Sequence, residues 1–206
     1  PVKASCSVQT RRDGKIRIMK WVVAMVLLCT LVTCSLYVGS VSTTPKENDM
    51  GLIVETIKRE EGFSARAYND SLGYPTIGYG KLIIKMFMPA DLFMIEVTEA
   101  QANDWLVEEV ADIEDRLSKG QHAGVWEDEI RGSLSRRTAL IQMAYQLGYK
   151  GTMEFYDMWS HLYLGNFEGA ADAMQDSKWA KQTPARADRM ARLMSGEQIT
   201  EVYGDL

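Results

Sequence analysis

The chain has 206 residues, of which 46% are hydrophobic and 25% are charged, so it can bury the core of one sizeable domain and is not a disordered chain. Its net charge of −5 is unevenly spread, because residues 1–50 carry seven Lys or Arg against three Asp or Glu, whereas residues 51–206 carry sixteen against twenty-five. A body this acidic argues against a nucleic-acid partner, since binding to phosphates requires a basic face.

The N-terminal residues have the pattern of a membrane-targeting segment. Six Lys or Arg lie within residues 1–20, and no charged residue occurs from Trp21 to Pro45. Residues 21–41 are apolar and long enough to span a bilayer as a helix. Basic residues on their N-terminal side predict that residues 1–20 form a cytoplasmic tail and that the body is exported. Residues 42–49, rich in Ser, Thr, Pro and Asn, are predicted to be a linker.

Three fates are open for residues 21–41 after export. Interspersed Thr, Ser and Gly residues make the span weakly apolar, as expected of a segment that arrests in the bilayer and is later released. The small residues Val38 to Ser40 also fit the cleavage site of a removable signal peptide. Leu31 to Cys34 is similar to a lipobox, which would make Cys34 a lipidated N-terminus, although Thr33 is larger than the residue usual there.

The three cysteines, Cys6, Cys29 and Cys34, all precede the predicted body. On an intact helix Cys29 and Cys34 are displaced by about 7.5 Å along the axis and point to different faces, which excludes a disulfide between them. The body contains no cysteine, so a thiol of the N-terminal segment cannot inhibit the enzyme by blocking a catalytic cysteine. Any inhibition of a tethered form therefore has to be steric or conformational. His122 and His161 are isolated in the sequence, and we expect no metal and no other cofactor.

The body is predicted to begin near Met50 with a short helix that ends at a glutamate. Asn48 or Asp49 can cap the helix and Gly62 provides a C-terminal stop, so that Glu61 falls in the last turn. The negative end of the helix dipole and partial burial favour a protonated carboxyl there, as a general acid requires. The apolar residues at helical spacing are Ile53, Val54 and Ile57.

A hairpin with a second carboxylate follows this helix. Residues 63–69 and 74–79 predict two short strands around a turn that begins at Asp70, and Pro75 is tolerable only at a sheet edge. Asp70 ends a strand, in more polar surroundings than Glu61. One carboxyl pushed towards neutral and one left ionised is the arrangement that cleaves glycosidic bonds, although a helix-ending Glu and a turn Asp are also common structural residues.

This region carries one string of marked positions, namely Glu61, Gly62, Tyr68, Asp70, Gly73 and Thr76 to Gly80. The string closely resembles the catalytic signature of the phage lysozymes of the T-even type, which are glycoside hydrolases of the muramidase class. The resemblance implies that Glu61 is the general acid, that Asp70 with Thr76 activates a water, and that the anomeric carbon is inverted. The presence of both Asp70 and Thr76 speaks against a lytic transglycosylase, which needs no water-activating carboxylate.

Residues 81–97 depart from the family pattern. Lys81 stands where the family commonly has a His that supports structure. Residues 82–97 are rich in Met and bulky apolar residues where relatives usually have polar strand or loop sequence. One interpretation is a cover strand and loop that closes the core of the small lobe, with Met filling gaps. The alternative is an exposed apolar patch that meets the membrane or the anchor.

The rest of the body is predicted to be helical. Thr98 and Gln101 form a capping box, which starts a long helix over residues 98–118 that joins two lobes. Residues 119–206 then show only helical patterns, interrupted by Gly. The fold class is therefore α+β, mainly α: a bilobal lysozyme fold in residues 50–206 with a small β-hairpin lobe, a connecting helix and an all-helical C-terminal lobe, preceded by the hydrophobic N-terminal helix.

Two segments of the helical lobe, residues 137–148 and 177–187, look like the best-marked large-lobe motifs of the same family. On that resemblance Arg186 would form an ion pair with Glu61 across the cleft, and Gln146 would line the cleft where the lobes meet. An Arg beside Glu61 lowers the pKa of its carboxyl, which opposes the helix dipole and burial. The sequence leaves open which influence prevails, and Arg186 can equally serve to fix the rotamer of Glu61.

The predicted function is that of a phage endolysin, which hydrolyses the β-1,4 bond between N-acetylmuramic acid and N-acetylglucosamine in peptidoglycan to lyse the host. Residues 21–41, which are similar to the signal-arrest-release segments of some endolysins, would hold the enzyme at the host inner membrane with its body in the periplasm until release as a monomer. Two other classes stay open. One is a membrane-tethered peptidoglycan-binding module without catalysis, and the other is a virion-associated lysozyme used at infection.

Overall fold

The computed structural model describes residues 47–205, which belong to the second of two units in the chain, Pro45–Leu206. The predicted cytoplasmic tail, membrane span and cysteines lie outside the described residues, as does most of the predicted linker. Within residues 47–205, no helix combines the length and the apolarity needed to cross a membrane. The described part is mainly helical with one small antiparallel sheet, as the sequence predicts.

The first described helix, α2 (Glu47–Glu61), begins earlier than the sequence predicts. Asn48 and Asp49, the two predicted caps, lie inside it, and residues 47–49 are therefore helix rather than linker. Acidic side chains in a first turn are favoured by the positive end of the helix dipole, which accounts for this extension. The helix ends at Glu61 as predicted, because Gly62 adopts a left-handed φ of 68° and donates its N–H to the Lys58 carbonyl at 2.9 Å.

The predicted hairpin is confirmed and gains a third short strand. Strands β1 (Ser64–Asn69), β2 (Pro75–Gly78) and β3 (Lys81–Leu82) pair antiparallel in the order β1-β2-β3. Pro75 therefore lies on the central strand, and the prediction of an edge position is wrong. The strand tolerates Pro75 because it is the first residue of β2, opposite Asn69, where the ladder only begins.

Residues 83–97 form a loop with one short 3₁₀ turn, η1 (Ala90–Leu92), rather than a cover strand. An isolated β-bridge between Arg66 and Glu96 pairs the loop with strand β1. Ala90 and Val97 are buried, but Met86, Phe87, Leu92 and Met94 are exposed. The interpretation of a cover that closes the core with Met as gap-filler is therefore wrong for these side chains, and the alternative of an exposed apolar patch describes them.

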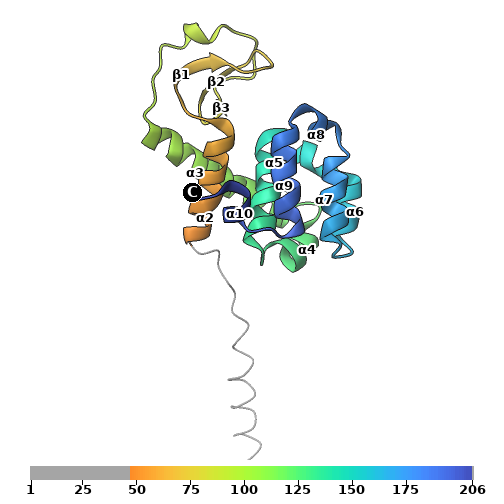
Figure 1. Cartoon of the computed structure of the whole chain (residues 1–206). Coiled ribbons are helices and arrows are strands. Elements are labelled where there is room, and N and C mark those ends of the chain that lie inside the picture. The colour runs from red at the N-terminus through yellow and green to blue at the C-terminus, as the bar shows by residue number, and fades with distance from the viewer. Residues whose placement is uncertain (1–46, 206) are drawn as a thin grey trace, which may run out of the picture. The chain divides into compact units, whose positions relative to one another are not determined.

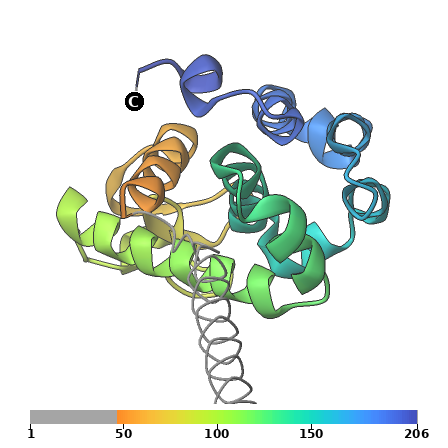
Figure 2. The same ribbon diagram turned by 90° about the horizontal axis from the view of Figure 1, so that it is seen from below.

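The long connecting helix α3 (Glu99–Lys119) starts with the predicted Thr98–Gln101 capping box. In Figure 1 the sheet lies beyond one end of α2, and the helices that follow α3 gather in a group beside it. Figure 2 shows α2 and α3 next to one another, with the later helices of the chain to one side of them. One continuous cluster of buried apolar side chains extends from Ile53 in α2 through Val110 to Leu193, so both lobes share a core.

The helical lobe contains more elements than its sequence motifs predict. The longest helix of this lobe, α5 (Leu134–Met153), is kinked at Gly148, where the sequence predicts a stop and where φ is 73°. A final helix follows the predicted stop at Gly196 and returns to α2, as Figures 1 and 2 show. In order, the elements are α4 (Ala123–Val125), the π-helical turn η2 (Trp126–Ile130), α5 (Leu134–Met153), α6 (Tyr156–Leu162), α7 (Phe167–Gln175), α8 (Lys178–Gln182), α9 (Pro184–Ser195) and α10 (Ile199–Tyr203).

Candidate active site

The last residue of α2 and a residue of α9 form an ion pair that joins the two lobes. Arg186 Nη1 donates to Glu61 Oε1 at 2.6 Å, and the two side chains are 8% and 23% exposed. This is the ion pair that the sequence predicts. The other guanidinium nitrogen of Arg186 donates to Gln142 Oε1 at 2.7 Å, so the arginine is fixed from its own lobe before it reaches Glu61.

The backbone of the β2–β3 turn packs against the other face of the Glu61 carboxyl. Gly80 has a φ of 91°, and a Cβ atom at this position would lie 3.4 Å from Glu61 Oε2 and 3.7 Å from the Tyr145 hydroxyl. Tyr145, on α5, donates its hydroxyl to the Tyr79 carbonyl at 2.6 Å. Glycine is favoured at this turn for its left-handed conformation, since a Cβ would make only ordinary van der Waals contacts with Glu61 and Tyr145.

Tyr68, Asp70 and Thr76 lie together on the hairpin. Tyr68 pairs with Thr76 across the two strands, so these two side chains lie on the same face of the sheet, and Asp70 begins the turn two residues after Tyr68. Burial raises the pKa of the Tyr68 phenol, and the charges of Glu61 and Asp70 raise it further. The phenol therefore lies within the field of both carboxylates and stays a neutral hydrogen-bond donor.

Asp70 uses one of its carboxylate oxygens to hold its own turn. Asp70 Oδ1 accepts hydrogen bonds from the backbone N–H groups of Leu72 at 2.9 Å and Tyr74 at 2.8 Å. No residue of the described range 47–205 hydrogen-bonds to Oδ2. The structural role of a turn aspartate is thus fulfilled by one oxygen, and the other is available to bind a water.

Thr76 is buried on the central strand, with 3% of its surface exposed. Its hydroxyl donates to the Tyr74 carbonyl at 3.2 Å. Because the proton is used in this bond, the hydroxyl oxygen keeps its lone pairs as acceptors. The Thr76 oxygen can therefore accept a hydrogen bond from a water molecule.

The two predicted large-lobe residues differ in their placement. Arg186 reaches across to the small lobe, whereas Gln146 Oε1 accepts from Trp179 Nε1 at 2.8 Å inside the helical lobe. The glutamine at the lobe junction is Gln142, one turn earlier on α5, whose amide also donates to the Thr56 hydroxyl at 3.0 Å. A polar residue at an otherwise apolar position of the helix was the signal that the sequence offered for Gln142.

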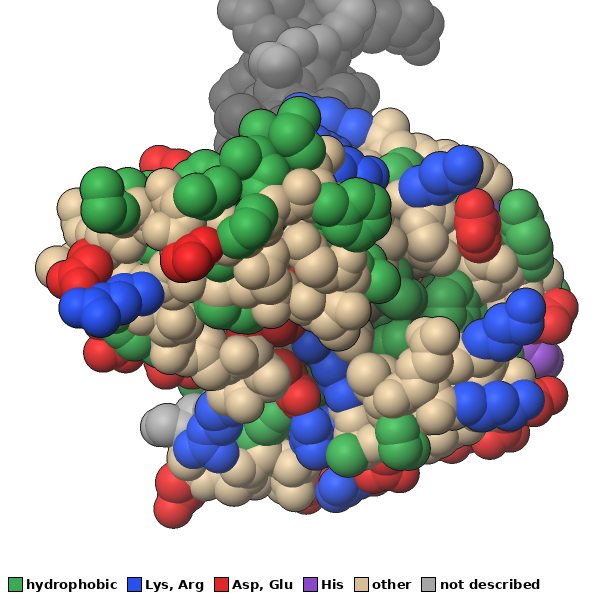
Figure 3. Space-filling model, turned by 90° about the horizontal axis from the view of Figure 1, so that it is seen from above, with side chains coloured by type: hydrophobic (Ala, Val, Ile, Leu, Met, Phe, Trp, Pro, Cys, Tyr) green, Lys and Arg blue, Asp and Glu red, His purple; other side chains and the backbone are tan. Residues whose placement is uncertain are grey.

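The surface is hollowed where the two lobes meet, and Lys, Arg, Asp and Glu side chains are present in the hollow (Figure 3). Within residues 47–205, no three side chains of His, Cys, Asp or Glu come together to hold a metal ion. His122 is buried and its ring stacks on that of Trp159, with the ring centroids 4.1 Å apart, so His122 is a packing residue.

The chain belongs to the phage lysozyme family, whose pattern matches residues 58–194 and so covers every predicted site residue. It is similar to the pre-baseplate central spike protein Gp5 of Enterobacteria phage T4, with 31% identity over 170 residues. This match covers 74% of the present chain and 29% of the spike protein. The chain is also similar to the probable T4-type lysozyme 1 of Dictyostelium discoideum, with 28% identity over 154 residues, which is 67% of this chain and 90% of that protein.

Proposed function

We propose that the chain is a lysozyme that hydrolyses the β-1,4 glycosidic bond between N-acetylmuramic acid and N-acetylglucosamine in peptidoglycan. Family membership supports this proposal, and one observation in the site carries it. Glu61 and Asp70 each commit one oxygen to the protein, to Arg186 and to the Asp70 turn respectively. Among the described residues, their second oxygens have no hydrogen-bond partner, which suits one carboxyl for proton donation and the other for holding a water.

In the proposed reaction, protonated Glu61 gives its proton to the glycosidic oxygen as the bond between this oxygen and the anomeric carbon breaks. A water molecule held by Asp70 and Thr76 attacks the anomeric carbon from the opposite face. Asp70 accepts the proton that the water loses, and attack from the face opposite the leaving group inverts the configuration at this carbon. Transfer of a proton back to Glu61 through solvent restores the starting state.

Arg186 acts in this scheme as a positioning residue. Its bonds to Glu61 and Gln142 fix the rotamer of the acid and link α9 to α2 at the point where the lobes meet. Tyr145 and Gly80 close the opposite side of the acid. The sequence-based assignment of Gln146 to the cleft stays a prediction.

Purified peptidoglycan and mass spectrometry test the reaction. The wild-type chain is expected to release fragments that end in a reducing N-acetylmuramic acid, and Glu61→Gln should release none while binding the wall normally. Anhydro ends would indicate a lytic transglycosylase instead. Wall binding without any soluble product from the wild type would leave a tethered binding module as the function.

We further propose that the chain is an endolysin that residues 21–41 hold at the host inner membrane, with the body in the periplasm and a monomeric enzyme after release. The charge-free run and the basic residues before it support this localisation. Intact mass and activity measured before and after membrane depolarisation test it. Release without a change in mass is the expected result, whereas a smaller or lipidated product would identify signal cleavage or acylation.

A virion-associated lysozyme is the second candidate function. The observation in its favour is the 31% identity to a baseplate spike protein. Antibodies against the chain decide between the two functions. Labelling of purified particles would support the virion role, and labelling confined to membranes of producing cells would support the endolysin.

A further inference from the structure

The small lobe exposes a group of large apolar side chains that no described residue covers. Four of them lie in the loop after β3, where Met86, Phe87, Leu92 and Met94 are 54%, 74%, 63% and 97% exposed. Figure 3 shows hydrophobic side chains gathered over this lobe. We refer to residues 82–95 as the apolar loop. A contiguous apolar surface of this kind on a folded domain marks a site of interaction with a partner or a membrane.

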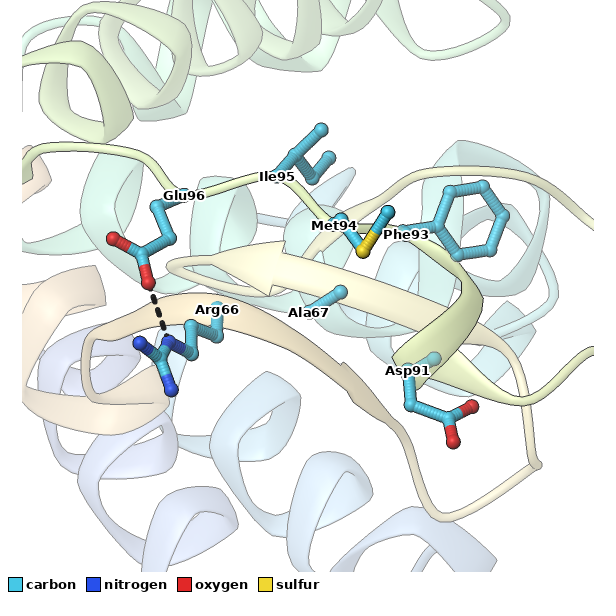
Figure 4. Close-up of a pocket in the computed structure, with 8 residues that line it drawn as sticks. Arg66, Ala67, Asp91, Phe93, Met94, Ile95 and Glu96 are labelled. Atoms are coloured by element: carbon cyan, nitrogen blue, oxygen red, sulfur yellow. Dashed lines mark hydrogen bonds and ion pairs between the residues drawn. The ribbon is translucent and has the colours of Figure 1, made fainter.

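A hollow of about 460 Å³ lies between the apolar loop and strand β1. Figure 4 shows Phe93, Met94 and Ile95 along one side of it, with the Arg66–Glu96 ion pair towards one end. This ion pair is 2.6 Å long, and its side chains are 80% and 64% exposed. An exposed pair contributes little to stability, so both groups are free to exchange partners.

The chemistry of this surface matches a phospholipid. Phe93, Met94 and Ile95 suit an acyl chain, while Arg66 and Glu96 place a positive and a negative charge side by side at the rim, and Asp91 adds a second negative charge to the lining. These opposite charges are complementary to a zwitterionic headgroup, whose phosphate would face Arg66 and whose ammonium would face Glu96. We propose that the apolar loop seats the small lobe on a phospholipid surface. This proposal rests on the membrane localisation proposed above and not on the hydrolase activity.

The length of chain before α2 allows this contact. Only residues 42–46 separate the predicted membrane span from Glu47, and five extended residues reach about 17 Å. The 15 residues of α2 extend about 22 Å to the small lobe. These lengths allow the domain to lie with α2 along the bilayer and the apolar loop turned towards the lipid. Tethering keeps the effective lipid concentration high, so that a weak contact suffices.

The proposed seat is connected to the candidate active site. Phe87 stacks on Tyr74 with ring centroids 4.8 Å apart, and the backbone of Tyr74 holds Asp70. Asn69, the residue before Asp70, donates to the Met88 carbonyl at 2.7 Å and accepts from the Ala90 N–H at 2.9 Å. Lipid contact at the loop is thus made directly beside the turn that presents Asp70.

Depth-dependent fluorescence quenching tests the proposal on the full chain. Its three native cysteines are replaced by serine, and a fluorophore is attached at Met94→Cys or, as the matched control, at Leu164→Cys. Leu164 is an equally apolar residue, 80% exposed on the helical lobe. The chains are reconstituted in phosphatidylethanolamine–phosphatidylglycerol vesicles that carry a quencher in their acyl chains. Before quenching is measured, flotation of the protein with the vesicles establishes that the chain is anchored in them.

The expected result is a blue shift and quenching at position 94, and neither at position 164. Quenching should persist at about 0.5 M salt, because apolar contact is insensitive to screening. Phe87→Ser should lower the ratio of chains whose apolar loop contacts lipid to chains whose loop does not by about tenfold, whereas Leu164→Ser should not change this ratio. A chain that floats with the vesicles but shows no quenching at position 94 would overturn the proposal, although the membrane anchor would still be supported. A blue shift without quenching would indicate self-association and would overturn the proposal in the same way. Failure to float would overturn the anchor as well.

Discussion

Helix α2 ends on two adjacent glutamates that the fold holds in opposite ways. Glu60 is enclosed: Arg189 donates to its two oxygens at 2.6 Å each, the Tyr203 hydroxyl donates at 2.8 Å, and the side chain is 6% exposed. Glu61 receives a single bond, from Arg186, and its side chain is 23% exposed. Both carboxylates are paired with an arginine of α9, so the difference lies in the second oxygen.

This contrast separates a structural carboxylate from one available for chemistry. A buried acid whose oxygens are all hydrogen-bonded fixes its surroundings in one arrangement. An acid with an unpartnered oxygen at a lobe junction keeps a position from which a proton can be transferred. The pair provides a matched comparison within one helical turn, because each glutamate can be replaced by a glutamine of the same shape.

The largest expected difference is in catalysis. Glu61→Gln should lower the rate on purified peptidoglycan by about 10² to 10⁴, the usual contribution of a general acid. Glu60→Gln should leave the rate within about tenfold of wild type at a temperature where both variants are folded. Circular dichroism provides the check on folding. More than a few per cent of activity in Glu61→Gln would remove this residue from the acid role.

The second difference is in stability and has the opposite order. Glu60→Gln should reduce the free energy of unfolding by about 2 kcal/mol, somewhat less than for a fully buried pair because Arg189 keeps some access to water. Glu61→Gln should cost less, since it removes only one bond. Urea titration measures both. Glu197→Gln is the control, because Arg192 donates to both oxygens of Glu197 as Arg189 does to Glu60, but on the surface. The loss of stability should be smaller than for Glu60→Gln.

The Glu60 carboxylate should make the stability of the protein depend on pH. Burial raises the pKa of Glu60, but hydrogen bonds from Arg189 and Tyr203 outweigh it, and the pKa lies below its ordinary value of 4.5. The stability from this group is therefore fully present above about pH 4.5 and is lost as the pH falls through the lower folded value. Melting temperatures of wild type and Glu60→Gln should converge as the solution is acidified. A gap that stays constant down to pH 2 would contradict the assignment.

The smallest effect on stability and rate is expected for a substitution of Tyr145, which lies beside Glu61. Tyr145→Phe removes the hydroxyl that donates to the Tyr79 carbonyl and should cost about 1 kcal/mol of stability. The rate on peptidoglycan should fall by no more than about fivefold, because the Tyr145 hydroxyl donates to the Tyr79 carbonyl and not to a carboxylate. Differential scanning calorimetry and the wall assay together measure this. A loss as large as that of Glu61→Gln would make Tyr145 a participant in proton transfer.

Local signals made half of the site predictable from sequence. Gly62 ends the helix after Glu61, and turn residues place Asp70 between two short strands, so both carboxylates follow from their immediate neighbours. The capping box at Thr98 belongs to the same class. Arg186 is different: its contact with Glu61 spans 125 residues, and only the family resemblance pointed to it.

The remainder could not be predicted for physical reasons. The partners of Glu60 lie 129 and 143 residues away on α9 and α10, and no pattern near Glu60 distinguishes it from Glu61. Apolar composition alone predicts burial, yet Phe87 and Met94 are exposed because the loop carries more large apolar residues than the small sheet can cover. The membrane span in residues 21–41 stays a prediction.

The return of the chain to α2 has a consequence for the timing of synthesis. Arg59 donates to the backbone carbonyls of Tyr203 and Asp205, and the Tyr203 side chain reaches Glu60. The helix that ends in the acid is among the first parts of the body to leave the ribosome, but the residues that fix its end are among the last. A growing chain therefore contains Glu61 and Asp70 before α9 supplies Arg186 and before α10 closes on the end of α2.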